Sequence, residues 1–151
     1  STVDQKEHRC FIDGGVFANN PALSAYAEFR YHNSELHAED TMMLSIGTGR
    51  KSTHLDCEIT ASWGAAEWIY QGSYLTSNAI SSVSDYQLNA VYDSSSNYLR
   101  LDASFDDNHS SSMDNTDKEY LDYLISLGES IASERQSEMK DFAEKLIKNS
   151  N

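Results

Sequence analysis

Residues 9–21 read Arg9-Cys10-Phe11-Ile12-Asp13-Gly14-Gly15-Val16-Phe17-Ala18-Asn19-Asn20-Pro21. The first five predict a short buried strand that ends on a carboxylate, and the two glycines that follow break it. Asn20 and Pro21 predict a helix start, because Asn caps free backbone N–H groups and Pro fits the first turn. The residues that then share one helical face are Leu23, Tyr26, Ala27 and Arg30.

A second apolar run, residues 41–46, reads Thr-Met-Met-Leu-Ser-Ile and stops at Gly47-Thr48-Gly49, which predicts another strand. Strand, helix and strand of these lengths form a βαβ unit. We therefore expect segments 9–13 and 41–46 to be parallel neighbours joined by a right-handed crossover. Because no internal repeat or linker divides the chain, the sequence predicts a single α/β domain.

The remaining pattern is mainly helical. The segment from Trp63 to about Leu88 is rich in Ser but favours helix, and residues 97–102 alternate apolar and polar side chains as a strand does. Residues 104–115 form a polar loop rich in Ser and Asp.

Two helices are expected near the C-terminus. Thr116 to Glu119 matches a capping box, and apolar residues follow it at helical spacing. After Gly128 we expect a last helix with one buried face. The apolar residues of these two helices are Leu121, Leu124 and Ile125, then Met139, Phe142, Ala143, Leu146 and Ile147.

The charge of the chain limits its partners. The 151 residues carry a formal net charge of −13, which argues against nucleic-acid binding, since phosphates are neutralised by clustered Lys and Arg. Such a chain is also repelled by anionic membranes, so lipid contact would come from apolar groups, a local basic patch or a segment outside the chain. No apolar run is long enough to span a bilayer.

The N-terminal residues and the cysteines indicate the cellular compartment and suggest that the chain is part of a longer protein. Residues 1–9 are polar and charged, unlike a signal peptide. Cys10 and Cys57 form no Cys-x-x-Cys pair, which fits a reducing, cytoplasmic compartment. The chain begins at Ser1, without an initiator Met, and enters a strand almost at once, so we expect it to be part of a longer protein.

Asp13-Gly14-Gly15 is the motif that can carry chemistry. It follows a predicted strand, and open parallel sheets place their sites at the carboxyl ends of strands. A carboxylate there can accept a proton or orient a base, and the glycines allow a sharp turn and close backbone approach. The alternative interpretation is a simple Asp-Gly turn.

The segment Phe11 to Pro21 closely resembles the Asp-Gly-Gly segment of the patatin-like phospholipase family, in which an Asn-Pro pair opens the next helix. Leu44 to Gly49 is similar to the next element of that family, and Tyr98 to Leu101 and Met113 to Thr116 resemble a late strand and a pre-helix loop of bacterial members. The resemblance implies a three-layer α/β fold with a mainly parallel sheet. This chain would be its C-terminal part, ending in helices.

The family hydrolyses acyl esters with a Ser-Asp dyad, so the resemblance implies that Asp13 is the general base. The supporting motif residues would be Gly14, Gly15, Asn19, Asn20 and Pro21. The serine is expected in a Gly-x-Ser-x-Gly elbow, but no two of the seven glycines are four positions apart, so the nucleophile is not in this chain. The chain alone should therefore be inactive.

The resemblance further implies a phospholipid or other acyl-lipid substrate, no metal and no cofactor. Without the N-terminal half, the strands at 9–13 and 41–46 would present an unpaired edge and an uncovered apolar face, so we expect a partner, either the absent N-terminal half or a second copy of the chain. It also implies bacterial origin and a cytoplasmic protein that contacts membranes peripherally. The rival hypothesis is a non-catalytic regulatory or interaction module with the same fold.

Other candidate sites carry weaker signals. Gly47-Thr48-Gly49 has no third glycine at position 52 and is better interpreted as a strand-ending turn than as a phosphate loop. The histidines, His8, His32, His37, His54 and His109, lack metal-ligand spacing even with Cys10. Asp102, Asp106, Asp107 and Asp114 lack the spacing of a calcium loop. Trp63, Trp68, Tyr70 and Tyr74 could line an acyl channel, but core packing is the default.

Overall fold

The computed structural model describes residues 2–4, 9–51, 56–92, 97–106 and 114–149. It combines long helices with short strands, as expected of an α/β protein. The elements in chain order are β1 (Thr2–Asp4), β2 (Arg9–Phe11), the 3-10 turn η1 (Gly14–Val16), α1 (Ala22–His32), the 3-10 turn η2 (Ala38–Asp40), β3 (Met43–Ile46), β4 (Arg50–Lys51), α2 (Cys57–Ala61), α3 (Ala65–Val91), β5 (Tyr98–Leu101), β6 (Ser104–Phe105), α4 (Lys118–Glu134) and α5 (Gln136–Asn149).

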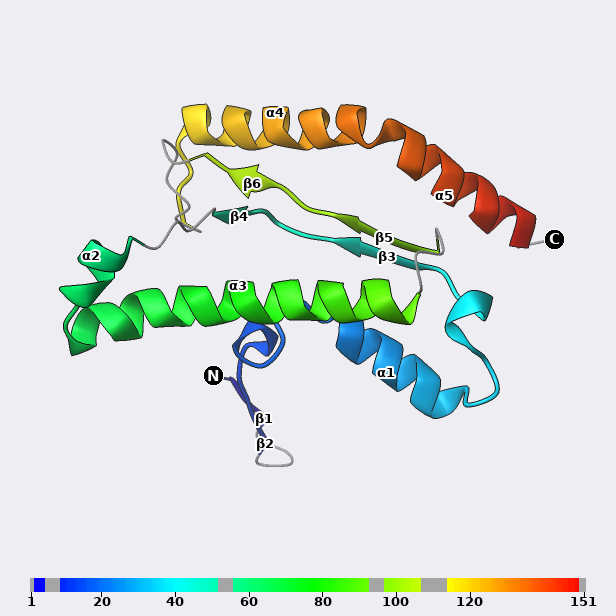
Figure 1. The fold of residues 1–151 in the computed structure, drawn as a ribbon, viewed down its shortest axis with the longest axis horizontal. Helices are drawn as coiled ribbons and strands as arrows, with labels where there is room; N and C mark the ends of the chain where they lie inside the picture. The colour runs from blue at the N-terminus through cyan, green and yellow to red at the C-terminus, as the bar shows by residue number, and fades with distance from the viewer. Residues whose placement is uncertain (1, 5–8, 52–55, 93–96, 107–113, 150–151) are drawn as a thin grey trace.

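The parallel pair β3–β5 lies at the centre of the molecule. Met43 is opposite Tyr98 and Ile46 is opposite Leu101. The two chain paths continue side by side into β4 and β6, which are also parallel (Figure 1). Helices α3 and α1 lie on one side of this pair and α4 and α5 on the other (Figure 1). Among the described residues β3 has no strand neighbour besides β5, so its outer edge is open.

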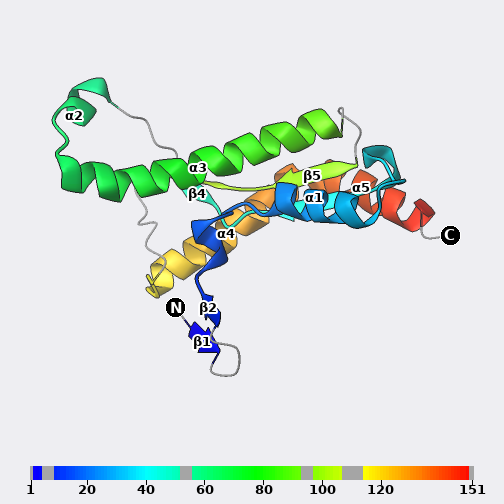
Figure 2. The same ribbon diagram turned by 90° about the horizontal axis from the view of Figure 1, so that it is seen from below.

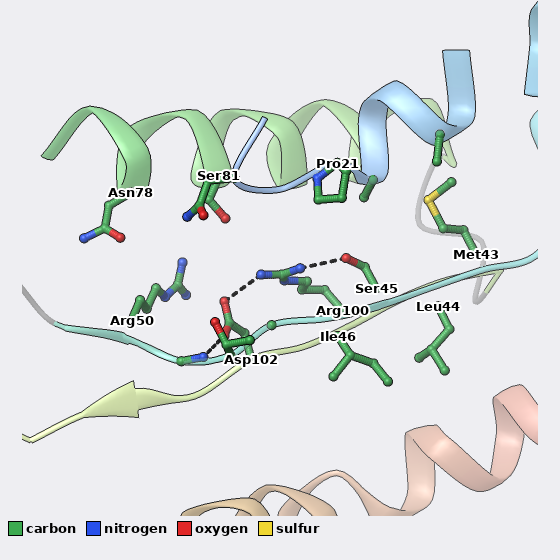
Figure 3. A pocket seen from close by; sticks show the side chains of 16 residues that line it. Pro21, Met43, Leu44, Ser45, Ile46, Arg50, Asn78, Ser81, Arg100 and Asp102 are labelled. Atoms are coloured by element: carbon green, nitrogen blue, oxygen red, sulfur yellow. Dashed lines mark hydrogen bonds and ion pairs between the residues drawn. The ribbon is translucent and has the colours of Figure 1, made fainter. Parts of the chain in front are cut away.

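Side chains alternate between the two faces of the β3–β5 pair, as strand geometry requires. Ser45 and Arg100 point toward α3, whereas Leu44 and Ile46 point toward α4 and α5 (Figure 3). Leu99, which is buried, lies in the strand that α5 contacts. The face toward α3 is therefore partly polar and the face toward α4 is apolar.

The main core lies between α1, α3 and the sheet. Ala22, Leu88 and Tyr92 are its buried members, and Leu88 is completely inaccessible. The Tyr92 ring stacks on Tyr98 with centroids 5.8 Å apart and lies tilted against Tyr26 at 5.7 Å. These ring contacts fix the end of α3 against both β5 and α1.

The segment 9–13 differs from the prediction. It is not a buried neighbour of β3: β2 pairs antiparallel with β1, and this hairpin projects from the helices (Figures 1 and 2). Phe11 and Ile12 are 52% and 71% exposed. Pairing with the nearby β1 closes a much shorter loop than pairing with β3, and it satisfies the same backbone groups. The predicted βαβ unit is therefore absent, and the parallel partner of β3 is β5.

The other predicted strands and the first predicted helix are present, but they begin and end at slightly different residues. β3 and β5 fall within 41–46 and 97–102. Helix α1 begins after Pro21, which occupies the cap position itself. The Ser-rich segment from Trp63 to about Leu88, predicted to be helical, falls almost wholly within the 27-residue α3, and the short α2 precedes it. Within the predicted polar loop, Ser104 and Phe105 form β6.

Two details of the C-terminal helices were predicted wrongly. Asp117, and not Thr116, caps α4, and it does so without a side-chain hydrogen bond. Gly128 lies inside α4, and the helix breaks at Arg135 instead. A single glycine costs a helix only about 1 kcal/mol, which the other residues of a 17-residue helix outweigh. Of the apolar stripe in α5, only Phe142 is buried.

Across the described ranges, no helix combines the length and apolar character needed to cross a membrane.

Candidate active site

Asp13 begins a tight turn. Its Oδ1 accepts a hydrogen bond from the backbone N–H of Gly15 at 2.7 Å, and the side chain is exposed. A Cβ on Gly15 would lie 2.8 Å from Asp13 Oδ1, whereas one on Gly14 would meet nothing within 4 Å. The second glycine is therefore the one that the carboxylate requires. Within the described ranges, Asp13 Oδ2 accepts no hydrogen bond, so one oxygen stays open to a further partner.

Asn20 fixes the start of α1 to α3. Its Oδ1 accepts from the Ala22 N–H at 3.2 Å, although the cap position itself is taken by Pro21 and not by Asn20 as predicted, and its Nδ2 donates to the Ser81 carbonyl at 3.2 Å. Only 3% of Asn20 is exposed, so both polar ends must be satisfied inside the protein. Asn20 thus holds the Asp13 segment, seven positions upstream, close to the central helix.

A cavity of about 320 Å³ lies along the open edge of β3, between this strand and helices α1 and α3 (Figure 3). We call it the strand-edge cavity. Asn19 and Pro21 of the predicted motif line it, but Asp13, Gly14 and Gly15 do not. Its other lining residues come mainly from residues 43–50 of β3 and β4 and the turn between them. The structure therefore brings only part of the motif to the carboxyl ends of the parallel strands.

A polar network crosses the floor of this cavity, and sequence reasoning missed it. Arg100 donates from Nη1 to Ser45 Oγ at 2.7 Å and from Nη2 to Asp102 Oδ2 at 2.8 Å (Figure 3). Asp102 Oδ1 accepts from the N–H groups of Gly49 at 3.1 Å and Ala103 at 3.0 Å. The alternation Tyr98-Leu99-Arg100-Leu101 was the available signal, because it places Arg100 on the less apolar face of its strand.

The Gly47-Thr48-Gly49 turn is built around this network. A Cβ on Gly47 would lie 2.1 Å from Asp102 Oδ1, and Gly49 has φ +94° and would place a Cβ 2.5 Å from Phe105 Cζ. The N–H of Gly49 is already bound by Asp102, so it cannot cradle a phosphate. The interpretation as a strand-ending turn is confirmed.

Tyr98, two positions before Arg100 in β5, is partly buried. Tyr98 donates to Asp85 Oδ1 at 2.7 Å. Burial, and then the hydrogen bond and negative charge of Asp85, raise the pKa of Tyr98 well above its usual value. Burial is also the main cause that raises the pKa of Tyr92, and the hydrogen bond with Thr41 opposes it. Both hydroxyls therefore have a hydrogen-bond partner inside the fold, Asp85 for Tyr98 and Thr41 for Tyr92.

The weaker candidate sites have local roles. His32 pairs with Glu28 at 3.0 Å and His37 caps η2, and the described ranges hold no cluster of three or more His, Cys, Asp or Glu that could bind a metal. Asp102 is held by Arg100. The predictions on His8, His54, Asp107, His109 and Met113 fall outside the described residues, and those on Cys10, Tyr70 and Tyr74 concern side chains that are not described.

The tryptophans lie outside the core, contrary to the prediction. Trp63 and Trp68 contact each other edge-to-face at 4.9 Å, and Trp68 is 49% exposed. They lie at the α2–α3 end, remote from the buried cluster around Leu88. Neither lines the strand-edge cavity.

Curated proteins similar to this chain are patatins. Patatin-like protein 3 of Arabidopsis thaliana is 30% identical over 146 residues, which cover 83% of this chain and 34% of that protein. Patatin-07 of Solanum tuberosum is 31% identical over 114 residues, or 71% of the chain and 28% of that protein. Patatin-T5 of the same species is 30% identical over 102 residues, or 64% and 26%. No protein-family model matches the chain.

The chain thus spans between about a quarter and a third of the length of these relatives. All three are plant proteins, which lends no support to the bacterial type that the motifs led us to expect. The first match extends across most of the chain. On this similarity, the chain belongs to the patatin-like family.

Proposed function

We propose that the whole protein is a lipid acyl hydrolase in which Asp13 is the general base of a Ser-Asp dyad. The nucleophilic serine would come from a segment outside these 151 residues. The observation that carries the proposal is the segment Asp13 to Pro21 in a chain similar to patatins over most of its length. The shared length, 34% of the first relative, leaves ample room for the nucleophile elsewhere.

The chemistry follows from the roles of the two groups. The serine hydroxyl attacks the ester carbonyl while Asp13 takes its proton, and the tetrahedral intermediate then expels the alcohol, which receives that proton from Asp13. Asp13 next takes a proton from water, which attacks the acyl-serine, and the carboxylic acid leaves as the serine regains its proton. Backbone N–H groups near the serine would stabilise the oxyanion. Asp13 is suited to this task, because it is exposed and only its Oδ1 is engaged by Gly15.

We further propose that in the whole protein β2 leaves the hairpin and pairs in parallel with β3, in a three-layer patatin-like fold. The open edge of β3, the cavity along residues 43–47 and the exposed Phe11 and Ile12 all support this pairing. It would bring Asp13 to the carboxyl end of β3, beside Gly47. The missing half of the domain, or a second copy of the chain, would then cover the apolar surface that the described chain leaves exposed.

The test is the Asp13→Asn variant of the full-length protein, assayed with a short-chain nitrophenyl ester. Asn keeps the shape and the turn-forming oxygen but cannot take a proton, so turnover should fall by about 10⁴-fold, with an unchanged melting temperature. Asp56→Asn is the matched control: Asp56 also caps a turn, through bonds to the N–H groups of Glu58 and Ile59. That variant should keep full activity.

Near-wild-type turnover of Asp13→Asn would show that Asp13 only forms a turn. The chain alone should not hydrolyse the ester, and activity of the pure chain that disappears on Asp13→Ala would contradict a nucleophile located elsewhere. A full-length sequence without a Gly-x-Ser-x-Gly elbow would favour the non-catalytic module instead.

A further inference from the structure

Three of the five arginines of the chain line one polar hollow of about 290 Å³. We call it the arginine hollow. Arg50 comes from β4, Arg100 from β5 and Arg135 from the junction of α4 and α5. The other lining residues are Asp85, Asn89, Tyr98, Leu99, Asp102 and Glu138. Three guanidinium groups from distant segments thus meet in a chain whose 24 acidic residues far outnumber its 11 basic ones. Such a gathering indicates an anionic ligand.

The arginine hollow is separate from the surface that we expect another segment to cover. Among the described residues that line it, none belongs to β3, so it lies on the β5 side of the strand pair, away from the open edge of β3. It shares Arg50, Arg100 and Asp102 with the strand-edge cavity, and from there it extends to α3 and to the α4–α5 junction. No residue of the segment Asp13 to Pro21 lines it. Pairing of β2 with β3 would therefore leave it open.

Two of the three arginines are held by carboxylates. Arg100 is bound to Asp102, and Arg135 donates from Nη2 to Glu138 Oε2 at 2.6 Å. Arg50 differs, because its guanidinium forms no hydrogen bond or ion pair with the described residues, and the residue is exposed. Its side chain points from β4 toward α3 (Figure 3). Arg50 is therefore the cation of this hollow that can bind a ligand without losing a partner.

Helix α3 contributes open acceptors to the arginine hollow. Asp85 Oδ1 accepts from the Tyr98 hydroxyl at 2.7 Å, and within the described ranges its Oδ2 accepts no bond. Asn89, one turn further along, donates from Nδ2 to the backbone carbonyl of Asp85 at 2.9 Å, and its Oδ1 is open among the described residues. Each side chain thus presents an oxygen that can accept a further hydrogen bond. Hydroxyl groups can donate such bonds.

We propose that the arginine hollow binds a small, soluble phosphate ester of a sugar or polyol. The phosphate contacts Arg50, and hydroxyl groups donate to Asp85 and Asn89. A phosphate suits the site because its oxygens accept hydrogen bonds from guanidinium groups that approach from different elements. The negative charge of Asp85 repels the phosphate, so the ligand binds with its hydroxylated end at α3. The inference goes beyond the proposed hydrolase activity and does not depend on it.

Size and charge favour a free metabolite over a phosphorylated lipid headgroup. The volume of the hollow is near the lower limit of about 300–1,000 Å³ for small-ligand sites. Apart from Leu99 and the Tyr98 ring its lining is polar, so it offers little surface to acyl chains. The net charge of −13 also repels the anionic membranes that carry phosphorylated lipids. A polyol phosphate such as sorbitol phosphate meets these conditions.

The first test is calorimetric titration of the full-length protein with sorbitol phosphate, sorbitol and inorganic phosphate. Sorbitol phosphate should bind about tenfold more tightly than inorganic phosphate, because it adds hydrogen bonds to the acceptors on α3. Sorbitol should show no measurable binding, and the affinity for the ester should fall with added salt. No saturable binding of the ester, or equal affinities for the ester and inorganic phosphate, would overturn the proposal.

The second test removes the open cation. Arg50→Gln should lower the affinity for sorbitol phosphate and for inorganic phosphate by about tenfold each, with little change in the melting temperature, because Arg50 is exposed and without a partner among the described residues. Arg30→Gln is the matched control: it changes the net charge equally, and Arg30 lies on α1, outside the arginine hollow. Equal losses of affinity in the two variants would mean a general charge effect and would overturn the site.

The third test concerns the hydroxylated end of the ligand. Asn89→Ala should lower the affinity for sorbitol phosphate about three- to tenfold and leave that for inorganic phosphate unchanged. Ala favours helix over Asn, so the fold is kept. Asn78→Ala is the control, because Asn78 lies in the same helix and lines the strand-edge cavity but not the arginine hollow. An unchanged affinity for the ester in Asn89→Ala would overturn the placement of its hydroxyl groups at α3.

A last comparison separates the possible sources of the phosphate. Phosphatidylcholine vesicles containing phosphatidylinositol phosphate should not sediment the protein. Sedimentation that Arg50→Gln abolishes, without binding of sorbitol phosphate, would overturn the assignment to a free metabolite. The two proposals also fail separately. Lost turnover in Asp13→Asn without binding of the ester would keep the dyad and remove this site, whereas an active Asp13→Asn enzyme that binds the ester would do the reverse.

Discussion

The Asp102 carboxylate lies 2.8 Å from the Arg100 guanidinium, and only 11% and 17% of these side chains are exposed. Asp102 also accepts from the N–H of Gly49, so one carboxylate joins the end of β5 to the turn that follows β3. Burial of an ion pair is costly unless every lone pair is satisfied, and here both oxygens are bonded.

Removing one member of this ion pair should destabilise the folded chain strongly. Asp102→Ala leaves the Arg100 charge buried and unpaired, and should lower the free energy of unfolding by about 3 kcal/mol. Replacing both residues, as Arg100→Met with Asp102→Leu, should recover much of that loss. Urea unfolding followed by circular dichroism measures all three variants. A loss below about 1 kcal/mol for Asp102→Ala would mean that the pair is solvated and weak.

Glycine at position 49 should be irreplaceable. Gly49→Ala adds a Cβ at positive φ and against the Phe105 ring, so it should cost about 1–3 kcal/mol. Gly72→Ala, in the middle of α3, should instead stabilise the chain by up to about 1 kcal/mol. The sign of the change in the urea midpoint separates the two. Stabilisation by both variants would show that the turn relaxes freely.

Stability should fall in alkaline solution through Tyr98. Its pKa is raised in the folded chain by burial and by Asp85, so folding favours the protonated hydroxyl. This contribution is complete below the unfolded pKa, about 10, and is lost as the pH rises toward the folded pKa. The unfolding free energy should therefore decline above about pH 10, by up to about 1.4 kcal/mol per pH unit.

Tyr98→Phe tests this assignment. It removes the bond to Asp85 and should cost about 1 kcal/mol at pH 7, yet it should flatten the decline above pH 10. Asp85→Asn should weaken the decline in part. An unchanged alkaline profile in Tyr98→Phe would assign the decline to Tyr92, whose pKa is also raised.

The chain alone should self-associate. The outer edge of β3 is open among the described strands, and Leu44 and Ile46 are 48% and 70% exposed. Open edges and apolar patches recruit other chains. Light scattering should detect dimers or larger species at micromolar concentration, and Leu44→Lys should reduce them. A monomer with a cooperative melt would refute the need for a partner.

The elements that could be predicted from sequence are those whose signals are local. The Asn20-Pro21 pair indicated the helix start because the Asn20 side chain bonds to the Ala22 N–H only two positions further on, and β5 followed from its own alternation. Whether segment 9–13 is buried could not be predicted in the same way, since this depends on which strand pairs with it. In this chain the pairing strand is β1 and not β3. Arg100 and Ser45 are 55 positions apart, so only the parallel register brings them together.

The tryptophans and the central tyrosines report on different parts of the molecule. Both tryptophans are at the α2–α3 end, touching each other, while Tyr26, Tyr92 and Tyr98 form the stacked centre near Leu88. Indole fluorescence will therefore report fraying of one helix end and remain largely silent about the interior. Loss of the interior will appear in the near-ultraviolet tyrosine bands. A mismatch between the two signals would describe local melting of α3, and should not be taken for an intermediate of the whole fold.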